Sequence, residues 1–98
     1  MKSLVEKIKE SIPTLVVFQH VGEQDAVEVK HLLDDLRAKY GERAAIISVD
    51  ASYNGHYKMY YKLNEYPTYI LFKEGQELMR ESGKKSQAEL EDMIDRSL

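Results

Sequence analysis

Two largely apolar runs separated by one helical pattern constrain the fold of this chain most strongly. Thr14 to Phe18 and Ala44 to Val49 are rich in β-branched residues and are typical of strands that are covered on both faces. The segment between them carries apolar residues at helical spacing: Val29, Leu32, Leu33, Leu36 and Tyr40. Gly41 follows and predicts the end of that helix. A strand, a helix and a second strand in this order predict a βαβ crossover.

The first residues predict a short helix in front of this unit. Ser3 and Glu6 have the spacing of a capping box. Apolar residues then fall on one helical face: Leu4, Val5, Ile8 and Ile12. Pro13 ends the helix because it lacks an amide hydrogen and disfavours helical angles at the preceding residue.

The second half of the chain predicts a helical connection, a hairpin and a last helix. Ala51 to Leu63 is rich in tyrosine and reads as a helical connection. Thr68 to Phe72 and Gln76 to Ser82 predict two antiparallel strands around a tight Glu74-Gly75 turn. Ser86 to Glu89 repeats the capping-box spacing, and Leu90, Met93, Ile94 and Leu98 give the last helix an apolar face.

The order of elements, α-β-α-β-α-β-β-α, predicts a single α/β domain over residues 1–98. Two βαβ-type crossovers followed by a hairpin predict a mixed four-stranded sheet with helices on both faces. The net charge of −3 comes from interspersed acids and bases, without a basic block that would indicate binding to nucleic acid. The first ten residues alternate charged and apolar side chains, so we expect no signal peptide and no membrane span, and a cytoplasmic protein.

The composition excludes several kinds of chemistry. The chain contains no cysteine, which excludes disulfides, thiol catalysis, thiolate metal sites and iron–sulfur clusters within it. His20, His31 and His56 stand alone, without a second ligand at metal spacing. No glycine-rich phosphate loop and no nucleophile motif is present. We therefore expect no cofactor and no metal.

Two stretches nevertheless resemble the thioredoxin family. Tyr66-Pro-Thr-Tyr-Ile-Leu-Phe-Lys-Glu-Gly75, followed by Ser82-Gly83 and an amphipathic helix, is similar to the C-terminal half of a thioredoxin. Leu15 to Phe18 and Leu32 to Leu36 match the strand and the helix that flank its active site. The resemblance covers roughly residues 3 to 98 and implies a thioredoxin-like fold.

The resemblance also shows what is missing. The family's Cys-Gly-Pro-Cys motif falls on Glu23-Gln24-Asp25-Ala26, so all four positions are replaced. The family's buried aspartate corresponds to Val17 and its partner lysine to Ile46. A carboxylate cannot form the mixed disulfide of thiol exchange. We therefore expect a redox-inactive domain that is not an enzyme. Glu23 and Asp25 suit the positive end of the following helix, and an acid/base role is the alternative for them.

A peptide-binding groove is the function that the resemblance leaves in place. In the family the proline matching Pro67 has a cis bond, the residue before it offers backbone groups to an extended peptide, and Ser82 to Lys84 form a further wall. Pro67 could instead serve only to shape its loop. The predicted groove residues are Gly22, Glu23, Gln24, Asp25, Ala26, Tyr66, Pro67, Thr68, Ser82 and Gly83.

The leading hypothesis is accordingly a non-catalytic interaction module that binds a protein or peptide partner. The alternative is a member of the thioredoxin-type oxidoreductases that acts in cell redox homeostasis or as an assembly subunit. The tyrosines at positions 53, 57, 60, 61 and 66 have two interpretations: core and rim packing, or an aromatic contact surface.

One sheet edge is a second candidate for contacts. Thioredoxins begin with an extra strand, which pairs with the strand that corresponds to Ala44 to Val49. This chain starts close to its first helix, so we expect Ala44 to Val49 to form an edge of the sheet. The run carries no charge between Arg43 and Asp50, and edges usually need such protection. The N-terminal residues would cover it, or a second copy or another partner would pair with it.

Overall fold

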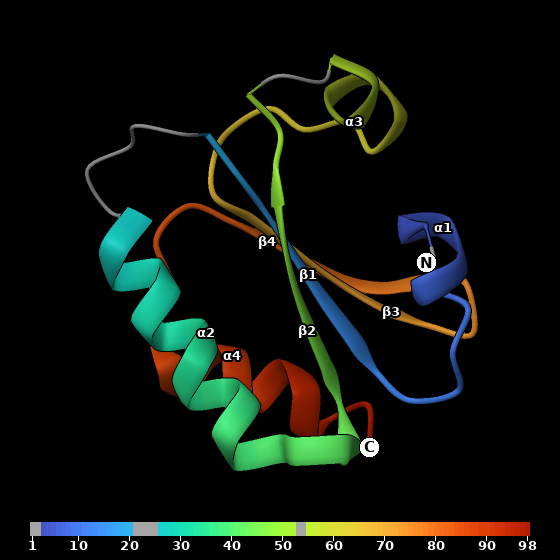
Figure 1. The fold of residues 1–98 in the computed structure, drawn as a ribbon, viewed down its shortest axis with the longest axis vertical. Coiled ribbons are helices and arrows are strands. Elements are labelled where there is room, and N and C mark those ends of the chain that lie inside the picture. The colour runs from blue at the N-terminus through green and yellow to red at the C-terminus, as the bar shows by residue number, and fades with distance from the viewer. Residues whose placement is uncertain (1–2, 21–25, 53–54) are drawn as a thin grey trace.

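The computed structural model describes residues 3–20, 26–52 and 55–98, which form one sheet between two layers of helices (Figure 1). The elements are α1 (Leu4–Lys7), β1 (Thr14–Gln19), α2 (Ala26–Tyr40), β2 (Ala45–Asp50), α3 (Gly55–Tyr60), β3 (Thr68–Lys73), β4 (Gln76–Ser82) and α4 (Gln87–Asp95). A short 3₁₀ turn, Gly41–Arg43, joins α2 to β2. The predicted order of elements is confirmed.

The sheet is mixed and has the strand order β2-β1-β3-β4. β1 pairs with β2 in parallel, with Leu15 opposite Ile46, and with β3 in antiparallel, with Val17 opposite Tyr69. β3 and β4 form the predicted antiparallel hairpin. The predicted four-stranded mixed sheet is thereby confirmed, and β2 lies at one edge of it. The second predicted βαβ crossover, from β2 to β3, is wrong, because β3 runs antiparallel to β1 and therefore also to β2.

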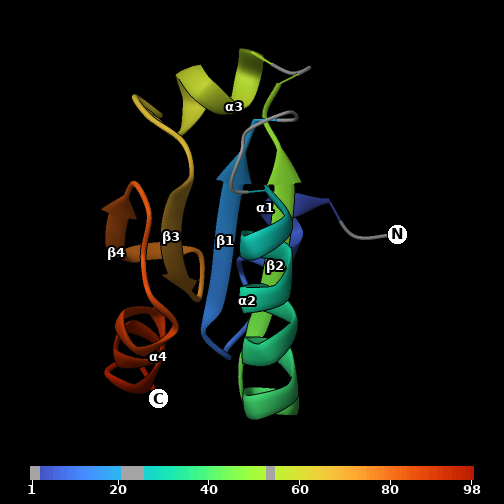
Figure 2. The same cartoon turned by 90° about the vertical axis from the view of Figure 1, so that its left-hand side faces the viewer.

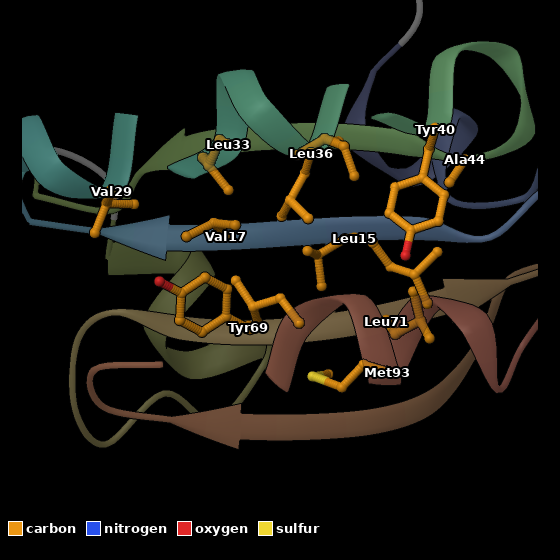
Figure 3. Packing of buried hydrophobic residues seen from close by; sticks show 13 residues of the cluster. Leu15, Val17, Val29, Leu33, Leu36, Tyr40, Ala44, Tyr69, Leu71 and Met93 are labelled. Carbon is orange, nitrogen blue, oxygen red and sulfur yellow. The ribbon is translucent and has the colours of Figure 1, made fainter. Parts of the chain in front are cut away.

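The two faces of the sheet have separate cores. α2 and α4 cover one face, and α1 and α3 lie on the other (Figures 1 and 2). Leu15 and Val17 of β1 pack beneath α2 and α4 (Figure 3), whereas Val16 and Phe18 pack toward α1 and α3. Because successive side chains of a strand point to opposite faces, a strand covered on both sides reads as the continuous apolar run seen in the sequence.

Tyr40 joins the end of α2 to α4. Its ring is 2% exposed, and its hydroxyl donates a hydrogen bond to Asp95 Oδ1 at 2.8 Å and lies 3.2 Å from the Glu91 carbonyl oxygen. Burial, together with the neighbouring Asp95 carboxylate, raises the pKa of Tyr40 well above its ordinary value. The C-terminal end of α2 is therefore fixed against α4.

The β3–β4 turn and the start of α4 form as their residues predict. Glu74 and Gly75 have φ angles of 54° and 83°, the two left-handed positions of a tight hairpin turn. Ser86 and Glu89 make the reciprocal bonds of a capping box. The hydrogen bond from the Ser86 backbone amide is the main cause that lowers the pKa of the Glu89 carboxyl, and the bond with the Ser86 side chain adds to it.

The first helix is shorter than predicted. Ser3 caps it, and its hydroxyl accepts the Glu6 amide at 3.3 Å, but α1 ends at Lys7 instead of continuing toward Pro13. The carbonyls that follow bond to the hairpin turn: Gly75 donates to Ile8 and Glu74 to Glu10, each at 2.9 Å. The predicted apolar face is therefore wrong in part, since Ile8 is 6% exposed but Val5 is 45% exposed. No described helix is long and apolar enough to cross a membrane.

Candidate functional site

The start of β3 carries the predicted proline. The Tyr66–Pro67 peptide bond is cis, as the resemblance implies. Pro67 is buried, and Thr68, the first residue of β3, is only 1% exposed. The proline is therefore held by the sheet and does not stand on a free loop.

Residues of β4 lie beside this proline. The Gly83 amide donates to the Pro67 carbonyl at 2.9 Å, and Thr68 is the register partner of Ser82. The Thr68 hydroxyl donates to the Glu65 carbonyl at 2.6 Å and lies 3.4 Å from the Ser82 hydroxyl. Gly83 has a φ of 84°, which side chains with a Cβ rarely adopt. The structure thus brings the predicted residues of β3 and β4 together.

A hollow of about 170 Å³ lies between Pro67 and α2, and we call it the Pro67 groove. Among the predicted groove residues that the structure describes, Pro67 is the one that lines it. The lining comes from α2, from Pro67 and β3, and from the segment that leads into α4: Glu28, Val29, Leu32, Pro67, Tyr69, Lys84, Lys85 and Gln87. Lys84 and Glu28 form an ion pair across its rim, with Nζ and Oε2 3.3 Å apart. Both side chains are largely exposed, so this pair adds little to stability.

The helical wall extends further along α2 than the sequence predicted. Ala26 is the first residue of α2 and is half-buried, while Gly22, Glu23, Gln24 and Asp25 lie outside the described residues. Sequence reasoning missed the parts of the wall contributed by Val29 and Leu32. Helical spacing was the available signal, because Val29 is three residues from Ala26 and Leu32 is three residues further on.

Apolar side chains fill the region under the groove. Val17 is fully buried and Ile46 is 8% exposed, and both belong to the core beneath α2. Figure 3 shows Val17 beside Val29 and Tyr69, two residues of the groove lining. Packing of apolar residues at the two positions where the resemblance places a buried ion pair is therefore confirmed.

The Tyr66 side chain lies on the face of the sheet opposite α2. Its ring packs toward the α1 and α3 side, with its centroid 4.2 Å from that of His20. Its hydroxyl is buried and has no hydrogen-bond partner among the described residues. Within those same ranges, the Tyr66 backbone N–H and C=O are also unpaired.

A second hollow, of about 590 Å³, lies between α1 and α3. It is lined by Ser3, Leu4, Val5, His56, Tyr57, Met59, Tyr60 and Tyr61. Tyr61 packs on Phe18 with ring centroids 5.0 Å apart, and burial raises its pKa, whereas Tyr60 is 72% exposed. Core packing is thus confirmed for Tyr61, whereas an aromatic contact surface that includes Tyr60 stays a prediction. Tyr53 lies outside the described residues.

The described residues gather no three metal-ligating side chains that could hold an ion. What they do gather is a backbone site: an unpaired peptide group at Tyr66, the Gly83 turn and an apolar hollow against α2.

Comparison with known proteins identifies the family. A family model for thioredoxin matches residues 26–96. The chain belongs to the thioredoxin family. Solved structures with this fold include a designed protein, 24% identical with a TM-score of 0.85, which matches over 95% of this chain and 82% of its own. A malarial protein, also 24% identical, has a TM-score of 0.80 over 89% of this chain and 98% of its own. These two likenesses show the fold alone. No curated protein matches the chain.

Membership of the thioredoxin family makes the cysteine count decisive. The domain has the family fold but lacks the CxxC motif, as predicted, and holds no cysteine at any of its 98 positions. Thiol–disulfide exchange needs a thiolate to attack and a thiol to leave. This chain therefore cannot carry out the family's redox reaction with its own side chains.

Proposed function

We propose that this domain is a non-catalytic interaction module that binds an extended segment of a protein or peptide in the Pro67 groove. The observation that carries the proposal is the unpaired Tyr66 peptide group beside the hollow of about 170 Å³. Among the described residues, the neighbouring Pro67 carbonyl is already used by Gly83, so Tyr66 is the place where an incoming chain would find free backbone groups.

Backbone pairing supports this mode of binding. An extended segment that passes Tyr66 can exchange N–H and C=O bonds with it, as peptides do when they add to an exposed strand. Such pairing gives affinity for many sequences, because it does not read side chains. The proposal therefore requires a further source of specificity.

The groove lining supplies that specificity. Val29, Leu32 and Tyr69 offer an apolar surface to a side chain of the bound segment, and Lys84 with Glu28 borders it with both signs of charge. A segment with an apolar side chain next to the residue that pairs with Tyr66 fits this lining best. Glu23 and Asp25 lie outside the described residues and stay predicted parts of the same groove.

Selection from a random peptide display library tests the proposal. The domain should enrich extended apolar peptides, and these should shift the ¹⁵N–¹H signals of Ala26, Tyr66, Thr68 and Gly83. Leu32→Ala should weaken the selected peptides about three- to tenfold, because it removes apolar contact area from the groove.

Leu78→Ala is the matched control, since Leu78 is a 44% exposed leucine outside the groove lining, and it should leave affinity unchanged. Thermal melts of both variants check that they fold. Enrichment of no peptide, or shifts confined to α1 and α3, would remove the basis of the proposal.

A further inference from the structure

The two edges of the sheet are protected very differently. The β4 edge carries Glu77, Arg80 and Glu81 and has an irregular register next to Phe72. Charges and bulges of this kind keep strand edges from pairing with other chains. The β2 edge is regular and has no charged side chain before Asp50, its last residue. Among the described elements, β2 pairs only with β1.

The β2 edge is also open in space. Figure 1 shows β2 in front of the other strands, between α2 and α1, and none of the described segments crosses in front of it. The N-terminal residues do not cover it within the described range, because Ile8 and Glu10 bond to the β3–β4 turn. Residues 3–10 therefore do not pair with this edge, while Met1 and Lys2 lie outside the described residues.

The outward backbone groups follow from the register. Ala45 donates to Pro13 at 2.9 Å and Ala51 donates to Gln19 at 2.8 Å, on the inner side of β2. Backbone groups along a strand alternate in direction, so Ile46, Ser48 and Asp50 direct their N–H and C=O to the open side. Their side chains lie on the α2 face, where Ile46 joins the core.

We propose that β2 pairs in antiparallel fashion with β2 of a second copy, about a twofold axis at Ser48. This register uses both outward backbone groups of Ser48 in each copy and makes Ile46 a member of the next directly opposed pair. Ser48 faces its own equivalent, and Ile46 faces Asp50 of the second copy. On the other face, Ile47 packs against Val49 of the second copy as a pair of β-branched residues.

Charge complementarity favours a second copy as the occupant. Arg37 of α2 reaches over the edge: its Nε donates to the Ile46 carbonyl at 3.2 Å, and its guanidinium pairs with Asp34 of the same chain at 3.0 Å. The register sets the Asp50 carboxylate of the second copy on the same face as that guanidinium, because directly opposed residues have their side chains on one face. The Asp50 carboxylate would then add a second acidic partner to Arg37, beside Asp34.

A single introduced cysteine reports the register directly, because the chain has none of its own. At a hydrogen-bonded antiparallel pair the Cα atoms lie about 5.5 Å apart, within the range of a disulfide. Ser48→Cys should therefore give a covalent dimer on mild oxidation. Leu78→Cys, on the protected β4 edge, is the matched control and should stay monomeric at the same protein concentration.

Ser48→Pro tests the pairing without a cysteine. It removes an outward N–H but no bond to β1, so the monomer should keep its fold while two interchain hydrogen bonds of the dimer disappear. We expect the dissociation constant of the dimer to rise about thirtyfold in sedimentation velocity. Circular dichroism checks the fold.

Arg37→Asp serves if the proline variant does not fold. It should weaken the dimer, and Asp50→Arg in the same chain should restore it, because the two charges are exchanged across the twofold axis. A wild type that sediments as a monomer at all concentrations would overturn the proposal. That result would hold even if the β2 edge binds a strand of another protein, because the proposal requires a second copy of this chain. Equal crosslinking of the Ser48→Cys and Leu78→Cys variants would overturn it as well.

Discussion

The two walls of the Pro67 groove are held by different means. Pro67 and Thr68 are buried, and hydrogen bonds from Gly83 and to Glu65 fix them to the sheet. The opposite wall begins at the half-buried Ala26 and is linked to the first by one exposed ion pair, Lys84 with Glu28. The wall that the fold needs for its packing has kept the family's residues, while the wall that carries the family's chemistry has changed.

This difference teaches where activity can be lost at little cost to a fold. The position of the resolving cysteine, Ala26, and the described helix start around it lie near the surface. Replacement there removes sulfur without opening a cavity. The buried positions that served the thiols, Val17 and Ile46, gain apolar contacts in exchange for charge. Burial of an unneeded charge is costly, so this change stabilises a domain that no longer exchanges electrons.

The largest effect is expected when sulfur is returned to the changed wall. The double variant Glu23→Cys, Ala26→Cys should catalyse insulin reduction by dithiothreitol above the no-protein rate, because it returns both thiols and the proposed groove would hold the substrate chain beside them. Glu23→Ser, Ala26→Ser is the matched control and should stay at the no-protein rate. A folded double-cysteine variant without activity would show that the Pro67 wall no longer presents substrate.

The fixed wall should be sensitive to loss of its buried hydroxyl. Thr68→Ala should lower the free energy of unfolding by about 2 kcal/mol, because the Glu65 carbonyl loses its partner at a site that is 1% exposed. Ser82→Ala, at the half-buried partner position, should cost about 0.5 kcal/mol. Urea denaturation followed by circular dichroism measures both. An equal loss of unfolding free energy in the two variants would contradict the larger contribution expected from the buried Thr68 hydroxyl.

The stability that the C-terminal end of α2 contributes should depend on the ionisation of the Tyr40 hydroxyl. The raised pKa means that the folded state keeps this proton to higher pH than the unfolded chain, whose tyrosines ionise near pH 10. Stability from this group is therefore complete below about pH 10 and is lost as pH rises above it.

Tyr40→Phe should cost about 1 kcal/mol at pH 7 and should reduce that alkaline loss. Some alkaline loss should persist, because the pKa of Tyr61 is raised too. Thermal melts between pH 7 and pH 11 give the comparison. An unchanged pH dependence in the variant would contradict the assignment of this loss to Tyr40.

The smallest effect should come from the link between the walls. Glu28→Ala and Lys84→Ala should each change stability by about 0.5 kcal/mol or less, because the pair is exposed. A double-mutant cycle measures the coupling. A coupling above about 1 kcal/mol would show that the helical wall is fixed more firmly than its exposure indicates.

Much of this arrangement was predictable from local signals. Apolar runs and turn residues predicted every strand, and the predicted Pro67 and Gly83 are joined by a hydrogen bond. The early end of α1 was not predictable, because the Ile8 and Glu10 carbonyls bond to a turn more than sixty residues away. The buried Tyr66 hydroxyl, without a hydrogen-bond partner among the described residues, was not predictable for a similar reason. The ring packs against His20, which lies far away in the sequence.

Amide hydrogen exchange at Tyr66 tests the central claim most directly, namely that the groove still holds an extended chain. With a peptide selected from the display library at saturating concentration, we predict that the Tyr66 amide becomes protected along with signals of the groove lining. The Leu32→Ala variant should lose that protection at the same peptide concentration. Unchanged exchange at Tyr66, with protection appearing on α3 instead, would contradict the account.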